Sequence, residues 1–289
     1  MECLFQLTGG LKKSCRFAAG GGSLSQAGSF SRDLHGKVAV VTGGSQGLGE
    51  AIAREFAGRG ARGLLLTGRN AGRGEAVAES LRKTGCDARF HQVDLADLDA
   101  VRQVVPAAER AFGHLDILVN AAGDTDRGTI FDTSPALYER IMAVNLRAPF
   151  FLIQDAAALM RRQDIPGAVV NIQSMSAHGG QPFLSAYSVS KAALAALTKN
   201  AAYGLLEHRI RVNGLNIGWM ATPGEDAIMK LRHDAKDDWL EEANASRPFG
   251  RLIDPREVAK AVAYLASAES GLMTGSNIDF DQTILGAHD

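Results

Sequence analysis

The sequence predicts an α/β protein in which seven parallel strands form one doubly wound sheet, with helices on both faces, in a single domain. Two observations predict this fold. From Lys37 onward, short apolar runs of strand length alternate with amphipathic helical stretches, and a glycine-rich turn follows the first apolar run. This alternation is typical of parallel strands joined by right-handed crossovers. The predicted strands are residues 38–41, 63–67, 88–93, 117–120, 168–172, 210–215 and 277–280.

Two of the intervening helices have clear starting signals. Ser134 is an N-cap residue followed by a proline at the first helical position. Asp254 repeats this arrangement before an alanine-rich helix, and Glu257 completes the pattern of a capping box. The polar stretch 218–250, between the sixth strand and this helix, is long for a connection. We expect it to form a lobe that closes over a substrate.

Composition restricts the class of function. The chain has 289 residues and a formal net charge of −1, with both signs interspersed, so it lacks the basic face of nucleic-acid and membrane-surface binders. No apolar run reaches membrane-spanning length. Cys3, Cys15 and Cys86 form no C-x-x-C pair, which argues against a disulfide framework or a zinc cluster. We therefore expect a cytoplasmic protein that acts on a small molecule, with no nucleic-acid partner, membrane partner or metal.

Residues 1–33 differ from the rest because they are rich in glycine and serine and lack apolar periodicity. We predict a flexible leader without chemistry there, and a catalytic domain over residues 34–289. The basic residues Lys12, Lys13 and Arg16 leave a transit peptide as an alternative. An appended segment or an over-long start is the preferred explanation on compositional grounds.

The glycine-rich turn predicts a dinucleotide pocket. Gly43, Gly47 and Gly49 lie between the first strand and a helix that has Ile52 and Phe56 on one face. Glycines are needed where the backbone turns tightly and where a phosphate approaches the amides at a helix N-terminus. Because such a turn can also serve only to connect a strand to a helix, the pattern needs support from other motifs.

The position that sets the cofactor preference is basic. In dinucleotide folds, an acidic residue about twenty positions after the glycines binds the ribose hydroxyls, and an arginine there accommodates a 2′-phosphate. Arg69 stands at that place and no carboxylate does, which favours NADP, with NAD as the alternative. Arg69 could equally be a solvated loop residue. Asp94, after the third strand, is placed either to accept the adenine amino group or to cap the next helix.

Five motifs then occur in one order along the chain. They are Thr42-Gly-x-x-x-Gly47-x-Gly49, Asn120-Ala-Ala-Gly123, Asn145, Ser174 and Tyr187-x-x-x-Lys191. Together they resemble the classical short-chain dehydrogenase/reductases over residues 37–286. The resemblance implies a Rossmann-type fold, a nicotinamide cofactor, no metal in the chemical step, and a homo-oligomer, either a tetramer or a dimer.

Tyr187 and Lys191 can also be interpreted physically. They lie four residues apart on a predicted helix, so both side chains project from one face. A tyrosine has a pKa of about 10 in isolation, and a nearby ammonium and an oxidised nicotinamide both favour the phenolate. We therefore expect a lowered pKa for Tyr187 and a role as acid/base. On its own such a pair is usually an ordinary helix face, but Ser174, at a strand end, can hold the reacting oxygen beside it.

The resemblance implies roles for the remaining candidates. Asn145 holds a water that links Lys191 to solvent, residues 120–123 pack beside the cofactor, and Thr222 binds the nicotinamide carboxamide. The catalytic candidates are Asn145, Ser174, Tyr187 and Lys191. The cofactor-binding candidates are Gly43, Ser45, Gln46, Gly47, Leu48, Gly49, Arg69, Asp94, Leu95, Asn120, Ala121, Gly123, Tyr187, Lys191 and Thr222.

Three positions depart from the family pattern. Ile217 replaces the usual proline after the sixth strand. The chain ends in Thr274-Gly275-Ser-Asn-Ile-Asp279-Phe-Asp-Gln-Thr instead of the common valine, aspartate and paired glycines, so the C-terminal contacts of the family, including subunit contacts, do not carry over directly to this chain. Gln46 occupies a turn position that is often basic in NADP-preferring members, which leaves Arg69 as the main NADP signal.

The substrate candidates are polar. They are Asp124, His178, Gln181 and Trp219, together with Ser174 and Tyr187. These groups fit a sugar or polyol better than a fatty-acyl or steroid substrate, although loop residues of this kind often point into solvent. We expect an NAD(P)-dependent dehydrogenase/reductase that moves a hydride between the nicotinamide and a secondary alcohol or ketone. The alternatives are a 3-oxoacyl-thioester (acyl carrier protein) reductase and a non-catalytic, cofactor-sensing regulatory protein.

Overall fold

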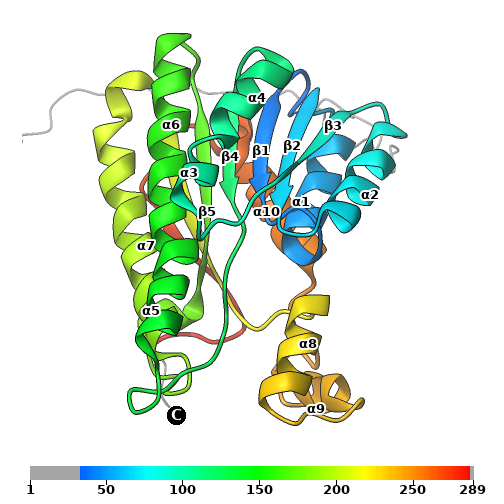
Figure 1. Cartoon of the computed structure of the whole chain (residues 1–289), viewed down its shortest axis with the longest axis vertical. Helices are drawn as coiled ribbons and strands as arrows, with labels where there is room; N and C mark the ends of the chain where they lie inside the picture. Colours follow the sequence, from blue (N-terminus) through cyan, green and yellow to red (C-terminus); the bar gives the residue numbers. More distant parts are fainter. Residues whose placement is uncertain (1–32, 287–289) are drawn as a thin grey trace, which may run out of the picture. The chain divides into compact units, whose positions relative to one another are not determined.

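The computed structural model describes residues 33–286 of the chain (Figure 1). The predicted leader lies outside these residues, apart from Asp33. All seven predicted strands are present. They are β1 (Val38–Thr42), β2 (Gly63–Gly68), β3 (Asp87–Gln92), β4 (Ile117–Asn120), β5 (Ala168–Ser174), β6 (Arg211–Ile217) and β7 (Asn277–Phe280).

The strands form one parallel sheet in the order β3-β2-β1-β4-β5-β6-β7, which confirms the predicted doubly wound fold. The central strand β1 pairs with β2 on one side and β4 on the other, so Val40 lies opposite both Leu65 and Leu118. The order of the strands reverses between β1 and β4. In open sheets of this kind, ligands bind outside the carboxyl ends of the strands at such a reversal.

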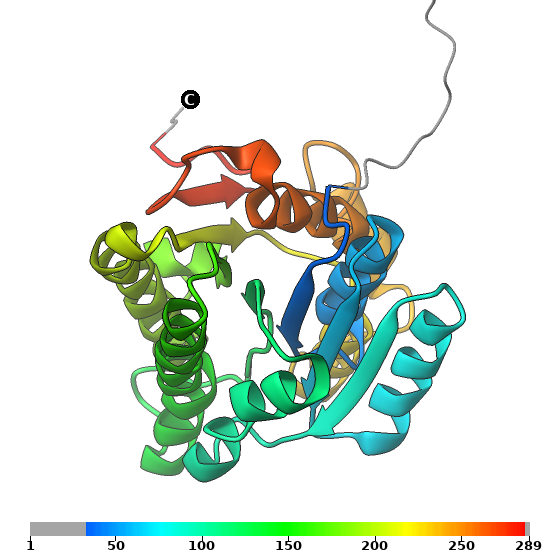
Figure 2. The ribbon, with the colours of Figure 1, turned by 90° about the horizontal axis from the view of Figure 1, so that it is seen from above.

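Helices cover both faces of the sheet (Figures 1 and 2). Helices α1, α2 and α10 pack on one face, and α4, α6 and α7 pack on the other. The helices are α1 (Gly47–Gly58), α2 (Ala71–Arg82), α3 (Leu98–Val101), α4 (Val104–Phe112), α5 (Pro135–Met142), α6 (Ala148–Arg162), α7 (Ser185–Gly204), α8 (Pro223–Arg232), α9 (Trp239–Ala245) and α10 (Pro255–Ala266). A π-helical turn (Ala143–Arg147) joins α5 to α6, and short 3-10 turns lie at Met175–His178, Leu206–His208 and Ala268–Ser270.

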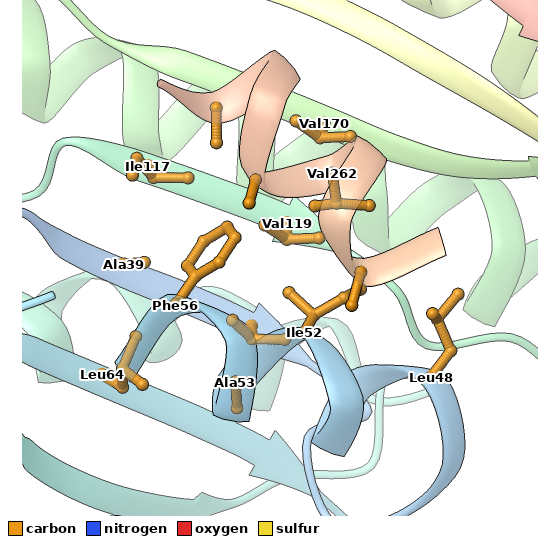
Figure 3. Close-up of a cluster of buried hydrophobic side chains, with 14 of the residues drawn as sticks. Ala39, Leu48, Ile52, Ala53, Phe56, Leu64, Ile117, Val119, Val170 and Val262 are labelled. Carbon is orange, nitrogen blue, oxygen red and sulfur yellow. The ribbon is translucent and has the colours of Figure 1, made fainter. Parts of the chain in front are cut away.

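The core has two halves because successive strand residues point to opposite faces. Ala39 and Val41 of β1 belong to the cluster that contains Phe56 of α1, shown in Figure 3, whereas Val38 and Val40 belong to the cluster on the other face. All five side chains are fully buried. A parallel strand that is buried on both faces is apolar at consecutive positions, which explains why these strands were recognisable as continuous apolar runs.

Both predicted helix starts are confirmed. Ser134 accepts a hydrogen bond from the backbone N–H of Leu137 at the start of α5. Asp254 and Glu257 form the complete capping box of α10. These caps satisfy N–H groups that have no partner within the helix.

The segment predicted as a lobe folds into α8 and α9, which Figure 1 shows below the sheet. Trp219 and Trp239 stack with ring centroids 6.0 Å apart, and Leu252 packs into the same small apolar cluster. A backbone bridge between Met220 and Ile253 closes the base of this segment. Within residues 33–286, no helix is long and apolar enough to cross a membrane.

Candidate functional site

One cavity of about 1260 Å³ runs along the carboxyl ends of the strands. Its lining includes Gly43 and Gly47 from the glycine turn, and also Ser174, Tyr187 and Lys191. Residues from distant parts of the sequence thus share one space, because every parallel strand delivers its carboxyl end to the same edge of the sheet.

The glycine turn fits the pyrophosphate of a dinucleotide. Gly43 and Gly47 adopt φ values of +70° and +57°, in the left-handed region that favours glycine. A Cβ at Gly49 would overlap the carbonyl oxygen of Gly43, so α1 begins in direct contact with the turn. The side chain of Gln46, at the N-cap of α1, makes no capping hydrogen bond. A helix start of this kind presents backbone N–H groups to an anion.

Two arginines line the cavity beyond β2. Asn70 caps α2 by accepting a hydrogen bond of 2.9 Å from the backbone N–H of Arg73. The Arg73 guanidinium donates to the side-chain oxygen of Gln46. Gln46 is itself uncharged, but through this hydrogen bond it holds the positive charge of Arg73 beside the glycine turn. Arg69 and Arg73 together provide two guanidinium groups at the wall where a 2′-phosphate is expected. The sequence reasoning missed Arg73, whose only signal is its place in the first turn of the next helix.

The cofactor candidates that line the cavity are Gly43, Ser45, Gln46, Gly47, Leu48, Gly49, Arg69, Asp94, Leu95, Ala121, Gly123, Tyr187, Lys191 and Thr222. Asn120 does not line it. Its amide nitrogen donates a 2.8 Å hydrogen bond to Asn171 inside the sheet. Asp94 accepts from the backbone N–H of Ala96, while Asp97 caps α3, so the hypothesis that Asp94 caps that helix is wrong.

Ser174, Tyr187 and Lys191 come from two elements that pack together. Ser174 ends β5, and the other two lie one turn apart on α7. The Lys191 ammonium lies 5.7 Å from the centroid of the Tyr187 ring and donates a 2.8 Å hydrogen bond to the carbonyl of Ile172, in β5. Because this bond ties α7 to β5, the lysine has a fixed position beside the tyrosine.

The expected lowering of the Tyr187 pKa is wrong for the chain by itself. Burial raises the pKa of Tyr187, because the phenolate loses its hydration, and a hydrogen bond to Ser174 opposes this only in part. Glu225 also raises this pKa and Arg127 lowers it. Burial lowers the pKa of Lys191 to about 8. Desolvation is thus the largest influence on both pKa values, whereas the spacing of the two residues in the sequence had suggested that the lysine charge would dominate.

Asn145 holds the cavity wall together. It lies in the π-helical turn, where its side chain is fully buried. The amide oxygen accepts from the backbone N–H of Asp124 at 2.8 Å, and the amide nitrogen donates to the carbonyl of Asp124 and to Ser190 at 2.9 and 3.1 Å. Asn145 therefore fixes the loop after β4 against α7, next to Lys191.

The substrate candidates divide into two groups. Asp124, Gln181 and Trp219 line the cavity. His178 does not: its ring nitrogen lies 3.2 Å from the carboxylate of Asp279, which does not line the cavity either. The position of a loop side chain depends on such long-range partners, which the sequence does not reveal.

The structure adds an ionic link across the cavity that sequence reasoning missed. Arg127, after β4, lies 3.5 Å from the carboxylate of Glu225 on α8 and donates a 3.2 Å hydrogen bond to His233. Asp126 and Arg232 form a second ion pair, at 2.7 Å, between the same two segments. The partners are about one hundred positions apart in the sequence, so no local pattern signals them.

Comparisons with known proteins agree with this geometry. A family model described as Enoyl-(Acyl carrier protein) reductase matches residues 43–283. L-rhamnose 1-dehydrogenase (NAD(P)(+)) of Azotobacter vinelandii is 35% identical over 249 residues, which cover 85% of this chain and 95% of that protein. A solved short chain dehydrogenase/reductase family protein has a TM-score of 0.75 at 36% identity and covers 86% of this chain and 97% of its own. The structure of NAD⁺-bound xylitol dehydrogenase has a TM-score of 0.79 at 29% identity, covering 86% of this chain and 99% of its own.

Proposed function

The chain belongs to the short-chain dehydrogenase/reductase family of oxidoreductases, and on this premise we propose that it transfers a hydride between NADP(H) and a secondary alcohol or its ketone. The observation that carries the proposal is the shared cavity, in which the glycine turn meets Ser174, Tyr187 and Lys191. When bound, the nicotinamide gives or accepts the hydride. The chain supplies the binding and the proton transfer.

Each catalytic candidate has a role that its contacts support. The Tyr187 hydroxyl gives a proton to the ketone oxygen or takes one from the alcohol, and Ser174 hydrogen-bonds the same oxygen. Lys191 supplies positive charge beside the phenol and donors for the ribose. Asn145 holds the loop and helix that flank Lys191, where a water relay to solvent would pass.

Arg69 and Arg73 support a preference for NADP, because two guanidinium groups suit a phosphate and no carboxylate stands there to bind ribose hydroxyls. NAD is the alternative. One relative is named for NAD(P)(+) and one solved neighbour is bound to NAD⁺, so relatives of this chain use both.

For the substrate we propose a polar compound such as a sugar or polyol. Asp124, Gln181 and Glu225 give the cavity hydrogen-bonding walls, and the names of two relatives refer to rhamnose and xylitol. The description of the family model favours a second candidate, an acyl thioester such as a 3-oxoacyl carrier protein. The complete set of catalytic candidates argues against a non-catalytic regulatory protein.

A binding and turnover experiment tests the proposal. NADPH and NADH are titrated against the protein, followed by oxidation assays with xylitol, ribitol, D-sorbitol, D-mannitol and L-rhamnose and by reduction of an acetoacetyl thioester. We expect tighter binding of NADPH and turnover of at least one polyol or sugar. Turnover of the thioester alone would favour the second candidate, and binding without turnover of any compound would favour the regulatory protein. Three expectations remain predictions: the homo-oligomer, the cytoplasmic location and the leader. Light scattering tests the homo-oligomer.

A further inference from the structure

The segment after β7 carries an acidic side chain, Asp281, at the carboxyl edge of the sheet. β7 ends at Phe280, which lies opposite Ile217 in β6, and Ile217 in turn lies opposite Ser174 in β5. Asp281 therefore lies just beyond the carboxyl edge of the sheet, and two strand spacings separate it from Ser174. Two strand spacings amount to roughly 10 Å. This distance suits contact with a part of the substrate several carbons away from the reacting oxygen.

The Asp281 carboxylate lines the same cavity as Ser174 and Tyr187. It packs directly over Gly218, where a Cβ would overlap its oxygen. A larger residue at 218 would displace the carboxylate, so Gly218 permits the position that Asp281 has.

Asp281 differs from the other carboxylates of the cavity because no side chain or backbone group among residues 33–286 donates to it. Asp124 accepts from Arg140 at 2.9 Å, Glu225 accepts from Trp219 at 2.9 Å, and Asp94 accepts from the backbone of Ala96. No hydrogen bond or ion pair from any residue within 33–286 reaches the Asp281 carboxylate. Partly buried carboxylates normally have donors, so this one has acceptor capacity for a ligand.

The side chain of the next residue, Gln282, holds the backbone around Asp281 in place. The Gln282 side chain accepts a 2.8 Å hydrogen bond from the backbone N–H of Phe249 and donates one of 2.7 Å to the carbonyl of Arg251. Gln282 thus faces the segment before α10, whereas Asp281 and Thr283 on either side of it both line the cavity. A pre-positioned acceptor loses little conformational entropy when a ligand binds.

We propose that Asp281, with Thr283 beside it, is a specificity-determining subsite that accepts a hydrogen bond from a substrate hydroxyl remote from the reacting carbon. This inference rests on the proposed dehydrogenase function and narrows its substrate class. The subsite selects uncharged polyhydroxy compounds over simple alcohols, because the remote carbons of a simple alcohol carry no hydroxyl group to donate a hydrogen bond to Asp281. It also disfavours fatty-acyl thioesters, whose acyl chain has no hydroxyl group to donate to the carboxylate.

The test compares two substrates on the NADP-loaded full-length enzyme. They are the fastest polyol of the panel above and the 2-alkanol of equal chain length. Asp281→Val removes the acceptor at similar size, and we expect the ratio of kcat/KM for the polyol to that for the alkanol to fall about 10- to 100-fold, the effect of one lost hydrogen bond to a charged group. Asp281→Asn keeps one acceptor oxygen and provides a second variant if the valine variant does not fold. We expect a smaller fall in the same ratio.

Asp279→Asn is the matched control, because Asp279 contacts Asn216 and His178 outside the cavity lining. Its substrate ratio should not change, and the NADPH Kd of all three variants should equal that of the wild type. If the ratio of kcat/KM for the two substrates is unchanged in both Asp281 variants, whether or not both values fall, the subsite is overturned while the proposed hydride transfer stands. A wild-type enzyme that oxidises neither polyols nor alkanols would overturn the proposed function and the subsite together.

Discussion

The ammonium of Lys191 and the ring of Tyr187 lie 5.7 Å apart, from nitrogen to ring centroid, while the same ammonium donates a 2.8 Å hydrogen bond to β5. Both residues lie on α7, which places them at the carboxyl edge of the sheet beside Ser174. Burial raises the pKa of the phenol and lowers that of the amine. The charges of Glu225 and Arg127 also act on the pKa of Tyr187.

Replacing the phenol should remove turnover without unfolding the protein. We expect Tyr187→Phe to lower kcat about 10²- to 10⁴-fold, the usual contribution of a positioned acid/base, with the NADPH Kd unchanged. Tyr203→Phe is the control, because Tyr203 lies on the same helix but is 82% exposed. Steady-state kinetics and a cofactor titration check both variants. Full turnover by Tyr187→Phe would remove the proposed mechanism.

The Arg127–Glu225 pair should shift the pH profile in opposite directions when each partner is neutralised. In the proposed mechanism, alcohol oxidation needs the phenolate of Tyr187, so we expect kcat/KM to rise with pH through the pKa of Tyr187. Glu225 raises that pKa and Arg127 lowers it. Glu225→Gln should therefore move the midpoint to lower pH and Arg127→Gln should move it to higher pH. Profiles from pH 6 to 10.5 measure the midpoints, and shifts of equal sign would indicate a purely structural link.

Lys191 should lower the free energy of unfolding at neutral pH. Burial lowers its pKa from 10.5 to about 8, so below pH 8 the folded state holds a desolvated ammonium, a destabilisation of about 3 kcal/mol. Between pH 8 and 10.5 the unfolded chain binds more protons, and the destabilisation declines as the pH rises.

We therefore expect Lys191→Met to increase the free energy of unfolding by about 1–2 kcal/mol at pH 7, since the lost hydrogen bond to Ile172 offsets part of the gain. The gain should shrink at pH 10, and activity should be lost. Urea denaturation at both pH values measures the effect, with Lys199→Met on the exposed side of α7 as the control. A variant less stable than the wild type at pH 7 would contradict this.

Arg73 should contribute to the choice of cofactor together with Arg69. We expect Arg69→Ala and Arg73→Ala each to weaken NADPH binding about 10- to 100-fold, the effect of losing a charged hydrogen bond to phosphate, and to leave NADH binding within about twofold. Calorimetric titration gives both dissociation constants. Arg54→Ala, an exposed residue of α1, should change neither. An equal loss for NADH and NADPH would mean that the arginines shape the pocket without reading the phosphate.

A side chain at Gly49 should be destabilising, because a Cβ there would overlap the Gly43 carbonyl. We expect Gly49→Ala to lower the free energy of unfolding by about 1–3 kcal/mol and to weaken NADPH binding. Gly58 ends the same helix with no atom within 4 Å of an added Cβ, so Gly58→Ala should be neutral or slightly stabilising. Thermal unfolding with and without NADPH separates the two effects. Equal melting temperatures for the two variants would refute the steric account.

The sequence by itself determined the sheet and the main motifs. Residues 38–41 and 168–170 are apolar at consecutive positions because both faces of a parallel strand are buried, so the strands could be found without tertiary information. Gly43 and Gly47 could be recognised because a left-handed backbone strongly favours glycine. Such signals are local: the residue type follows from the conformation of its own short segment.

The tertiary structure decided where the side chains point and how they ionise. His178 contacts Asp279 and does not line the cavity, Arg73 is held by Gln46, and Asp281 packs over Gly218. Each of these arrangements depends on residues from other strands or helices. The pKa values of Tyr187 and Lys191 depend on burial, which is a property of the assembled fold. Local sequence patterns cannot specify such partners, because contact and desolvation arise only when distant segments pack together.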